Sequence, residues 1–173
     1  MKKLNLCFFI TLFVSMSLFS DGVQPTGSGT ESAPYQVATL DNLLWISTND
    51  ISWDKHFIQI DDIDASDTQN WNEGEGFSPI GISQSNDFSG SYNGNDHTID
   101  WLYINRYSNY YQGLFGFTHS ATIENLGITN VIVCGDRYVG GLVGYNFVNS
   151  NINNCYSTGS ISVGSYEAGG LVG

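Results

Sequence analysis

The sequence predicts an all-β fold, a right-handed parallel β-helix with three short strands in each coil of about 29 residues. A glycine-rich string recurs along the chain, as YYQGLFGFT at 110–118, YVGGLVGYN at 138–146 and AGGLVG at 168–173. The composition agrees, because twenty glycines, three prolines and ten tyrosines favour turns and short extended segments over helices. A recurrence this literal indicates a repeat architecture in preference to an ordinary globular core.

The spacing of the repeated strings defines one coil. A shift of 28 carries Gly113 onto Gly141, and a shift of 29 carries Gly141 onto Gly170. The intervening text repeats at a shift of 29, which aligns Ile123 with Ile152. Each unit contains three extended runs separated by Gly, Asn or Ser, and these runs are too short for helices. We therefore expect each residue to stack on its counterpart in the next coil, with apolar rows facing the interior.

The repeated glycines and leucines are interpreted as structural residues. Leucine recurs where a side chain enters the core, and glycine recurs where the chain turns with a positive φ or passes close to the neighbouring coil. The first unit differs, because Gln112 stands where the later units have the first of two glycines. The residues assigned to this structural role are Gly113, Leu114, Gly116, Gly140, Gly141, Leu142, Gly144, Gly169, Gly170, Leu171 and Gly173.

These strings, together with INNCYSTGSISVG at 152–164, resemble the GLUG-motif repeats of bacterial secreted and surface proteins. The upstream segment 88–106 is similar to the text that commonly precedes such repeats. The resemblance covers roughly residues 77–173, which is more than half of the chain. It implies a surface scaffold, since similar repeats occur in adhesin-like proteins.

The N-terminal segment 1–22 is predicted to be a secretory signal peptide. Lys2 and Lys3 precede an uncharged apolar run from Leu4 to Phe19, and small residues follow that run. The alternative is a membrane anchor, because the run is near the lower limit of a membrane span. Removal of this segment would place the mature chain in the secreted or cell-surface compartment of a bacterium.

The rest of the chain divides into three predicted regions. Residues 23–34 are expected to be a flexible linker, 35–80 an N-terminal cap, and 81–173 the β-helix with its GLUG-type repeats. The sequence stops just after the third repeated string, so we expect a fragment of a larger protein, truncated at its C-terminus. An open last coil exposes apolar rows and unpaired strand edges, and self-association through that coil is expected.

The cap is expected to contain one short helix within residues 38–48. Leu40, Leu43 and Leu44 have helical spacing, and Thr39 is an acceptable N-cap. A β-helix exposes a section of its core at each end, so a capping element of different sequence is needed there. A strand and a loop complete the predicted cap.

The chain is acidic, with a net charge of −12. Lys55, Arg106 and Arg137 are the only lysines and arginines beyond residue 22. Such a surface repels phosphate backbones and anionic lipid heads, so a nucleic-acid partner is not expected. Membrane association is expected only through export or through a downstream anchor.

One acidic cluster is a candidate metal site. Asp61, Asp62, Asp64 and Asp67 lie close together in the sequence, and calcium binds to clusters of carboxylate oxygens. The stretch lacks the glycine and the closing glutamate of an EF-hand loop, and the alternative is a solvated acidic turn after a strand. We therefore expect no cofactor, with calcium left as the alternative.

Catalytic motifs are not found in this sequence. His56, His97 and His119 are scattered, so the histidine pair of a zinc protease is missing. The carboxylates of Asp96 and Asp100 could serve a polysaccharide-cleaving β-helix, but acids this common form such pairs by chance. We expect a protein that is not an enzyme.

Exposed aromatic residues form the candidate ligand site. In TIDWLYINR at 98–106, Ile99, Leu102 and Ile104 are expected to face inward. This leaves Trp101 and Tyr103 on the outer face, with Tyr107 following. Such a row can stack on sugar rings, so a host or environmental glycan is a candidate partner. Packing against a loop or a neighbouring coil is the alternative.

The two cysteines of the repeat region, Cys134 and Cys155, are expected to remain unpaired. At a shift of 29 they align with Val163 and Leu126, which are different apolar rows and belong to different walls. A disulfide needs Cα atoms within about 7 Å of each other. Both thiols are therefore expected to be buried as small hydrophobic groups.

These observations together predict a non-catalytic, exported or cell-surface scaffold with adhesin-like character. Its partner would be a glycan or a cell-surface protein. The alternative is a β-helix that binds or cleaves polysaccharides.

Overall fold

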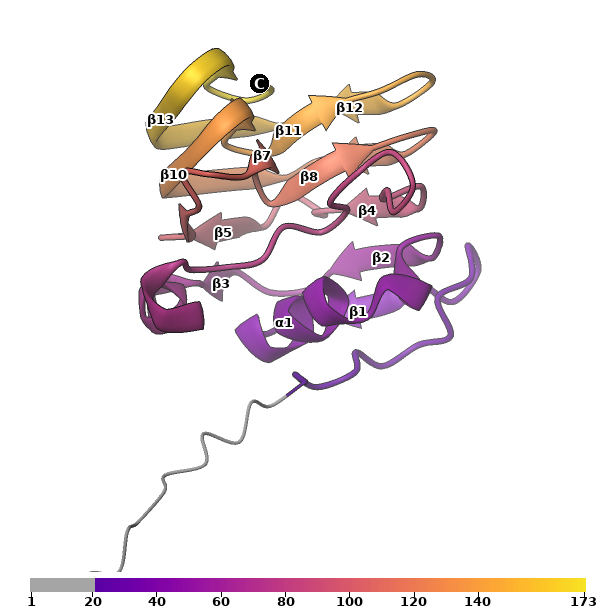
Figure 1. Cartoon of the computed structure of the whole chain (residues 1–173). Helices are drawn as coiled ribbons and strands as arrows, with labels where there is room; N and C mark the ends of the chain where they lie inside the picture. Colours follow the sequence, from indigo (N-terminus) through magenta and orange to yellow (C-terminus); the bar gives the residue numbers. More distant parts are fainter. Residues whose placement is uncertain (1–20) are drawn as a thin grey trace, which may run out of the picture.

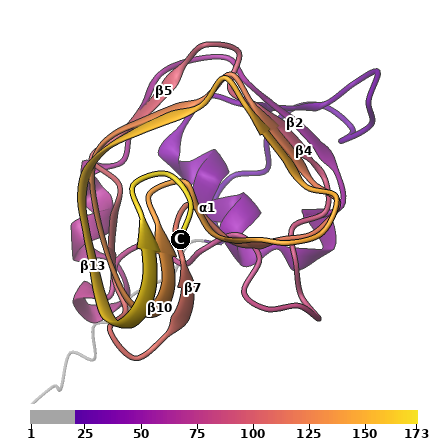
Figure 2. The ribbon, with the colours of Figure 1, turned by 90° about the horizontal axis from the view of Figure 1, so that it is seen from above.

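The computed structural model describes residues 21–173 and shows a mostly β chain wound into stacked layers (Figure 1). Seen along the stack, successive layers follow nearly the same outline (Figure 2). The predicted signal peptide, residues 1–22, lies outside the described residues except for its last two positions.

The described chain contains one α-helix, α1 (Leu40–Thr48), and three short 3-10 helices at Asp50–Ser52, Ser66–Asn70 and Asn72–Gly74. The strands are β1 (Tyr35–Val37), β2 (His56–Gln59), β3 (Ile63–Asp64), β4 (Ser91–Asn93), β5 (Thr98–Asp100), β6 (Tyr103–Asn105), β7 (Tyr110–Gln112), β8 (Phe115–Thr118), β9 (Thr122–Glu124), β10 (Gly127–Gly140), β11 (Val143–Asn146), β12 (Asn151–Asn153) and β13 (Tyr156–Gly169).

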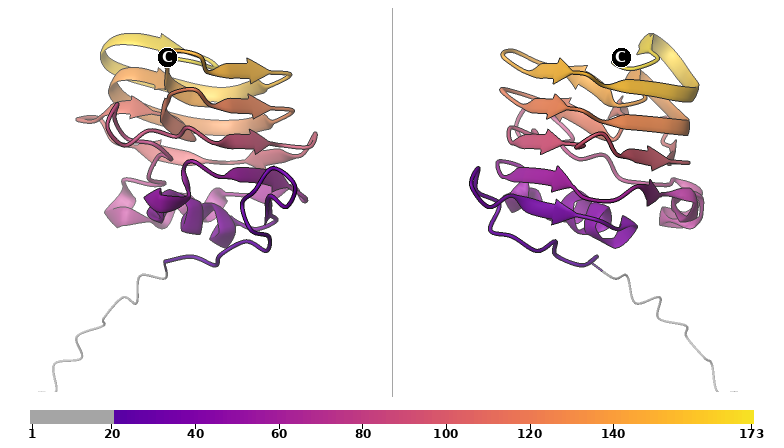
Figure 3. Two further views of the ribbon diagram at one scale, coloured as in Figure 1. Left: turned by 90° about the vertical axis from the view of Figure 1, so that its right-hand side faces the viewer. Right: turned by 180° about the vertical axis from the view of Figure 1, so that it is seen from behind.

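The strands form three sheets in which every strand pair is parallel. The first has the order β1-β2-β4-β9-β12, the second has the order β13-β10-β5-β3 with β6 and β7 also paired to β10, and the third joins β11 to β8. Figure 3 shows the same layers from two further sides. The predicted all-β class, with parallel strands, is confirmed.

The register follows the period of the sequence in the repeat region, whereas β1 and β2 at the N-terminal end pair at an offset of 22. In the first sheet, Asn151 pairs with Thr122 at an offset of 29. The offset falls from 29 at β6 to 27 at β7, where Arg137 pairs with Tyr110. Beyond the motif, β11 pairs with β8 at an offset of 28. The register therefore changes on both sides of β7.

Helix α1 lies across the N-terminal end of the stack (Figures 1 and 2), and it begins as its sequence predicts. The Thr39 side chain accepts a hydrogen bond from the backbone N–H of Asn42, whose own side chain accepts from the Thr39 N–H. This reciprocal pair satisfies donors that a helix start leaves open. Leu43 and Ile46 are fully buried, so one face of the helix covers the core.

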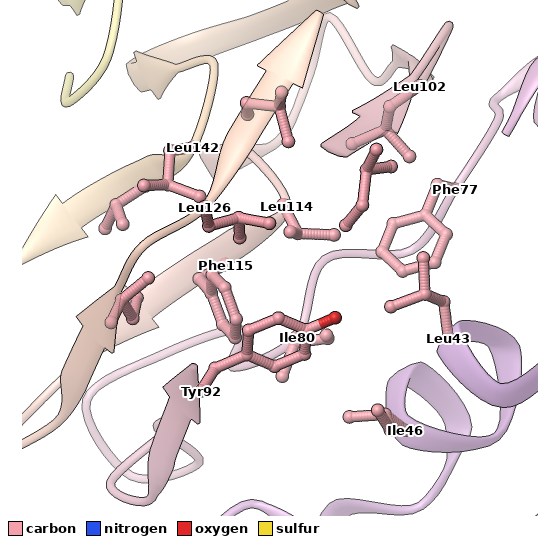
Figure 4. Packing of buried hydrophobic residues seen from close by; sticks show 14 of the residues in the cluster. Leu43, Ile46, Phe77, Ile80, Tyr92, Leu102, Leu114, Phe115, Leu126 and Leu142 are labelled. Atoms are coloured by element: carbon pink, nitrogen blue, oxygen red, sulfur yellow. The ribbon is translucent and has the colours of Figure 1, made fainter. Parts of the chain in front are cut away.

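Buried apolar side chains from successive layers form one continuous core (Figure 4). In the second sheet, for example, Ile104, Val133 and Ile161 occupy paired positions in three successive layers. Tyr92 is the largest of the fully buried side chains in the described chain, and its hydroxyl donates to the Oε1 of Gln59 at 3.0 Å. Burial raises the pKa of Tyr92 far above its ordinary value, so the hydroxyl stays protonated as a donor.

The motif glycines mark close approaches between backbone segments, and the expected positive φ angles are not found at them. A Cβ on Gly144 would lie 2.7 Å from the Gln112 nitrogen and 2.7 Å from the Gly116 carbonyl oxygen. The positive φ angles occur two residues before each motif, at Tyr111 (59°) and Tyr138 (57°). The corner prediction is corrected accordingly: the glycines admit a neighbouring strand, and the preceding residue makes the turn.

Asparagine makes another corner of the layers. Asn125 and Asn154 have φ angles of 53° and 48°, in the left-handed region that asparagine tolerates better than most residues. The Asn154 amide donates to the Asn125 Oδ1 at 2.9 Å, and the Asn125 amide donates to the Asn93 Oδ1 at 3.2 Å. These side chains therefore link three layers along the stack.

Cys134 and Cys155 are both free, as predicted, but only one of them faces inward. Cys155 packs against the core. Cys134 follows the fully buried Val133, so alternation along the strand turns its side chain outward. The expected burial is confirmed for Cys134, which is 8% exposed, whereas Cys155 is only half-buried. The expected inward facing of Cys134 was wrong because a register shift in the β10–β13 pairing aligns Cys134 with Ser162 and not with Val163.

Residues 23–34, expected to be a flexible linker, are held against the first layers by hydrogen bonds. The Gln36 N–H donates to the Thr26 carbonyl at 2.7 Å, and the His56 N–H donates to the Gly29 carbonyl at 3.0 Å. The segment is therefore attached to the first layers by backbone hydrogen bonds and is not a free linker.

Candidate functional site

The predicted aromatic site lies on the wall formed by β5 and β6, and its rings are dispersed. The residues expected to face inward, Ile99, Leu102 and Ile104, are fully buried as predicted. Trp101 is 51% exposed and Tyr107 is 58% exposed. Tyr103 and these two residues make no ring contact with one another in the described chain.

Tyr107 lies against the outward-facing Cys134. A side-chain hydrogen bond with the Cys134 thiol raises the pKa of Tyr107 above its ordinary value, since that bond favours the neutral phenol. This contact accounts for the burial of a cysteine on the outer face.

The structure brings a different set of aromatic rings together. We call it the aromatic cluster, and its members are Tyr110, Tyr111, Phe117, Tyr138, Tyr145 and Phe147. Tyr111 and Tyr138, from successive layers, stack with centroids 5.3 Å apart and planes 12° apart. Tyr145 meets Tyr138 edge-on at 4.8 Å, and Phe117 lies 5.3 Å from Tyr145.

The fold around the glycine motif positions this cluster. Figure 2 shows the ends of β7, β10 and β13 turning from the outline toward the inside, after which the chain passes through the motif and returns outward. Tyr111 and Tyr138 stand where the chain turns in, and Phe117 and Tyr145 stand on β8 and β11, where it returns. The glycines bring these two arms close, so the rings of one arm reach those of the other.

Arg137 borders the aromatic cluster. Its guanidinium carbon lies 5.6 Å from the ring centroid of Tyr110 and 5.3 Å from that of Tyr166, which occupy the same row in adjacent layers. Its Nε is buried without a hydrogen bond and lies 3.8 Å from a Glu167 carboxylate oxygen. Desolvation acts to lower the pKa of Arg137, but the neighbouring Tyr110 and Glu167 outweigh it and raise that pKa, so the side chain stays charged.

The other two cations beyond residue 22 are engaged elsewhere. Arg106 donates to Glu75 at 2.9 Å and to the Ser78 hydroxyl at 2.9 Å, and it also reaches backbone carbonyls. Lys55 pairs with Asp54 at 3.0 Å. Arg137 is therefore the cation of the described chain that lies beside exposed aromatic rings.

The acidic turn uses its carboxylates to bind backbone donors. Asp62 accepts from the Thr98 N–H at 2.7 Å, Asp64 accepts from the Ser66 N–H at 2.9 Å, and Asp61 accepts from the next N–H in the chain. These bonds lower the pKa values of Asp62 and Asp64. Within residues 21–173, no group of three or more His, Cys, Asp or Glu side chains is arranged to hold a metal ion. The fourth residue of the candidate calcium cluster, Asp67, is therefore not part of such a group either.

The remaining candidates for chemistry are occupied by local contacts. The Asp100 carboxylate accepts from Thr129 at 2.7 Å and from the Asn130 amide at 2.8 Å. His97 lies 3.4 Å from Asp62 in an ion-pair geometry. His119 and His56 likewise have partners, in Asp87 and Ser91.

Parallel layers with a recurring Gly-Leu motif define a β-repeat protein. The family model of the GLUG motif matches residues 135–162, in agreement with the resemblance seen in the sequence. The chain is therefore a GLUG-motif protein.

Two curated relatives are similar to most of this chain. Halomucin of Haloquadratum walsbyi is 38% identical over 160 residues, which is 88% of this chain and 2% of that protein. A protein named as a Gly-rich membrane protein of Evansella cellulosilytica is 32% identical over 143 residues, which is 79% of this chain and 16% of the relative. The chain thus spans a small part of each relative.

No solved structure gives a significant match to this chain. Among the described residues, no helix has the length and apolarity that a membrane span requires.

Sequence reasoning missed most of the aromatic cluster. Tyr110 and Tyr111 follow the predicted site in the sequence, but alignment on the glycines pairs Tyr110 with Tyr138. The structure pairs Tyr111 with Tyr138, because the offset before the motif is 27. The available signal was the aromatic residue that follows each Gly-Leu-hydrophobic-Gly string, Phe117 and Tyr145.

Proposed function

We propose that this chain is a right-handed parallel β-helix that acts as a non-catalytic, exported or cell-surface scaffold of adhesin-like character. The observation that carries the proposal is the parallel register, which recurs at offsets of 27 to 29 in the repeat region. A stack in which each repeat buries its apolar face on the next forms an extended, rigid body, as a spacer or display surface requires.

The names of the relatives support the proposed location. One is named Halomucin and the other a membrane protein, and both names agree with an extracellular or membrane-associated place. The acidic composition also suits an exposed surface, since a net charge of −12 favours solubility.

Export is tested with a fusion of residues 1–25 to an alkaline phosphatase that is active only in an oxidising compartment. We expect an active fusion, and Leu12→Arg in the apolar run should abolish the activity. An inactive wild-type fusion at normal expression would overturn the export proposal.

The enzymatic alternative is tested separately on the exported chain. We expect no new reducing ends and no unsaturated uronate products from a panel of neutral and acidic polysaccharides. Turnover that is lost in Asp100→Asn, with the fold retained, would replace the scaffold proposal with a polysaccharide-cleaving one.

A further inference from the structure

We propose that the aromatic cluster beside Arg137 binds a neutral polysaccharide, whose sugar rings pack on the exposed tyrosines while the guanidinium donates to sugar hydroxyls. The inference deepens the proposed function, because it gives the adhesin-like module a ligand class. It concerns a different set of rings from Trp101 and Tyr107, which make no ring contact with the cluster in the described chain.

The exposure of the cluster points to a surface role. Phe117 is nearly fully buried, and Tyr110 is 48% exposed. The other members of the cluster are half-buried: Tyr111, Tyr138, Tyr145 and Phe147. The cluster therefore presents aromatic surface to solvent across two layers. Tyrosine suits such a place, since its ring offers an apolar surface and its hydroxyl a polar contact. Contiguous exposed apolar surface of this kind marks interaction sites.

The backbone beneath the cluster is strained at two tyrosines. Tyr111 and Tyr138 hold φ angles of 59° and 57°, and Glu167 holds 53° at the corresponding position of the next layer. Such angles are rare for bulky residues and strain the backbone. Glycine or asparagine would make the same turn at lower cost, so the backbone alone does not call for tyrosine there.

The charges around the cluster decide the kind of sugar. Arg137 is the single cation, and it faces the carboxylate of Glu167 at 3.8 Å, with Asp136 adjacent in the chain. The Glu167 carboxylate offsets the charge of the one guanidinium, and the chain as a whole is acidic, so an anionic ligand such as a uronate is disfavoured. The guanidinium has five N–H donors in a planar fork, and such donors suit the hydroxyl groups of a neutral sugar.

The geometry also suits an extended ligand. The stacked pair crosses two layers, and Arg137 lies between Tyr110 and Tyr166 of the layers on either side. The site thus runs parallel to the stacking direction. A polymer can contact several rings at once, which a single sugar cannot.

The test uses affinity gel electrophoresis and calorimetry of the exported chain with hydroxyethylcellulose, xyloglucan and mannan, and with polygalacturonate as the acidic control. We expect at least one neutral polymer to bind. Tyr110→Ala and Tyr138→Ala should each weaken that binding about tenfold, as for contacts at the centre of an interface. Tyr110 is nearly half exposed, so its variant should keep the wild-type melting temperature even if the Tyr138 variant does not.

The matched control is the double variant Trp101→Ala and Tyr107→Ala, whose rings make no ring contact with the aromatic cluster within residues 21–173 and which should bind as the wild type does. No binding to any neutral polymer, binding to polygalacturonate alone, or full binding by the Tyr110 variant would overturn the proposal. Binding lost only in the control variant would also overturn it, because the site would then be at Trp101 and Tyr107. Because binding is measured on purified protein, none of these results affects the export test or the turnover test.

Discussion

Gly144 shows, at the scale of a single residue, why the repeated motif contains glycine. The atoms a Cβ would meet there are backbone atoms of Tyr111, Gln112 and Gly116, which cannot rotate away as a side chain can. A residue with a Cβ therefore fits at this position only if the neighbouring backbone segments move apart.

We predict that Gly144→Ala lowers stability by about 1–3 kcal/mol, the usual cost of overpacking a close contact. The matched control is Gly170→Ala in the last motif, where an added Cβ meets nothing within 4 Å. Thermal unfolding of both variants measures the difference. Equal melting temperatures would contradict the close-approach account.

Asp62 links stability to pH at the same scale. Its folded pKa is lowered first by the hydrogen bond from the Thr98 N–H, with His97 contributing less. A depressed pKa contributes stability above the unfolded value of about 3.9, and that contribution is lost as pH falls through the folded pKa.

We therefore predict that Asp62→Asn loses less stability than the wild type as the pH falls below about 4. At pH 7, the variant should be modestly less stable than the wild type. Chemical unfolding at several pH values measures this. Glu31→Gln, at an exposed position, serves as the control. An acid transition that is unchanged in Asp62→Asn would count against the proposed linkage.

The acidic turn also gives a prediction about calcium. Because Asp61, Asp62 and Asp64 already accept backbone hydrogen bonds, millimolar calcium should leave the melting temperature nearly unchanged. Calcium that bound the folded state, at a concentration about 100 times its dissociation constant, would raise stability by about 2–3 kcal/mol. A rise that disappears in Asp62→Asn plus Asp64→Asn would establish a calcium site.

Helix α1 shows what the sequence can predict at the scale of one element. Its start depends on local signals, Thr39 with Asn42 and the spacing of its apolar residues, and these are visible without the fold. The corners of the layers were less predictable, since the sequence indicates a turn but not which residue takes the positive φ. The facing of Cys134 was missed for the same reason, because a register shift is a property of two paired strands.

We predict that Thr39→Ala costs about 1 kcal/mol of stability through the lost N-cap. Thr39→Ser should retain most of it, since the hydroxyl can still accept from the Asn42 N–H. Urea unfolding monitored by circular dichroism distinguishes the two. A serine variant as weak as the alanine variant would show that the threonine methyl, and not the cap, matters.

For the whole molecule, the period was predictable in the repeat region, because successive layers there pair at offsets of 27 to 29. The parallel pairing of Asn151 with Thr122 is the direct outcome of that period. The candidate site was less predictable. Its rings come from the strands before and after the motif, and their meeting depends on a register offset that falls from 29 at β6 to 27 at β7.

The central claim is that one layer is an interchangeable unit, and a deletion of residues 122–150 tests it most directly. The deletion joins Ala121 to Asn151, which then takes the place of Thr122 beside β4. The control removes residues 122–136, about half of a layer, and so breaks the register. We predict that the full-layer deletion keeps a β-type circular dichroism spectrum and one cooperative melting transition, at a reduced temperature, while the control unfolds. Equal unfolding of both deletions would contradict the account.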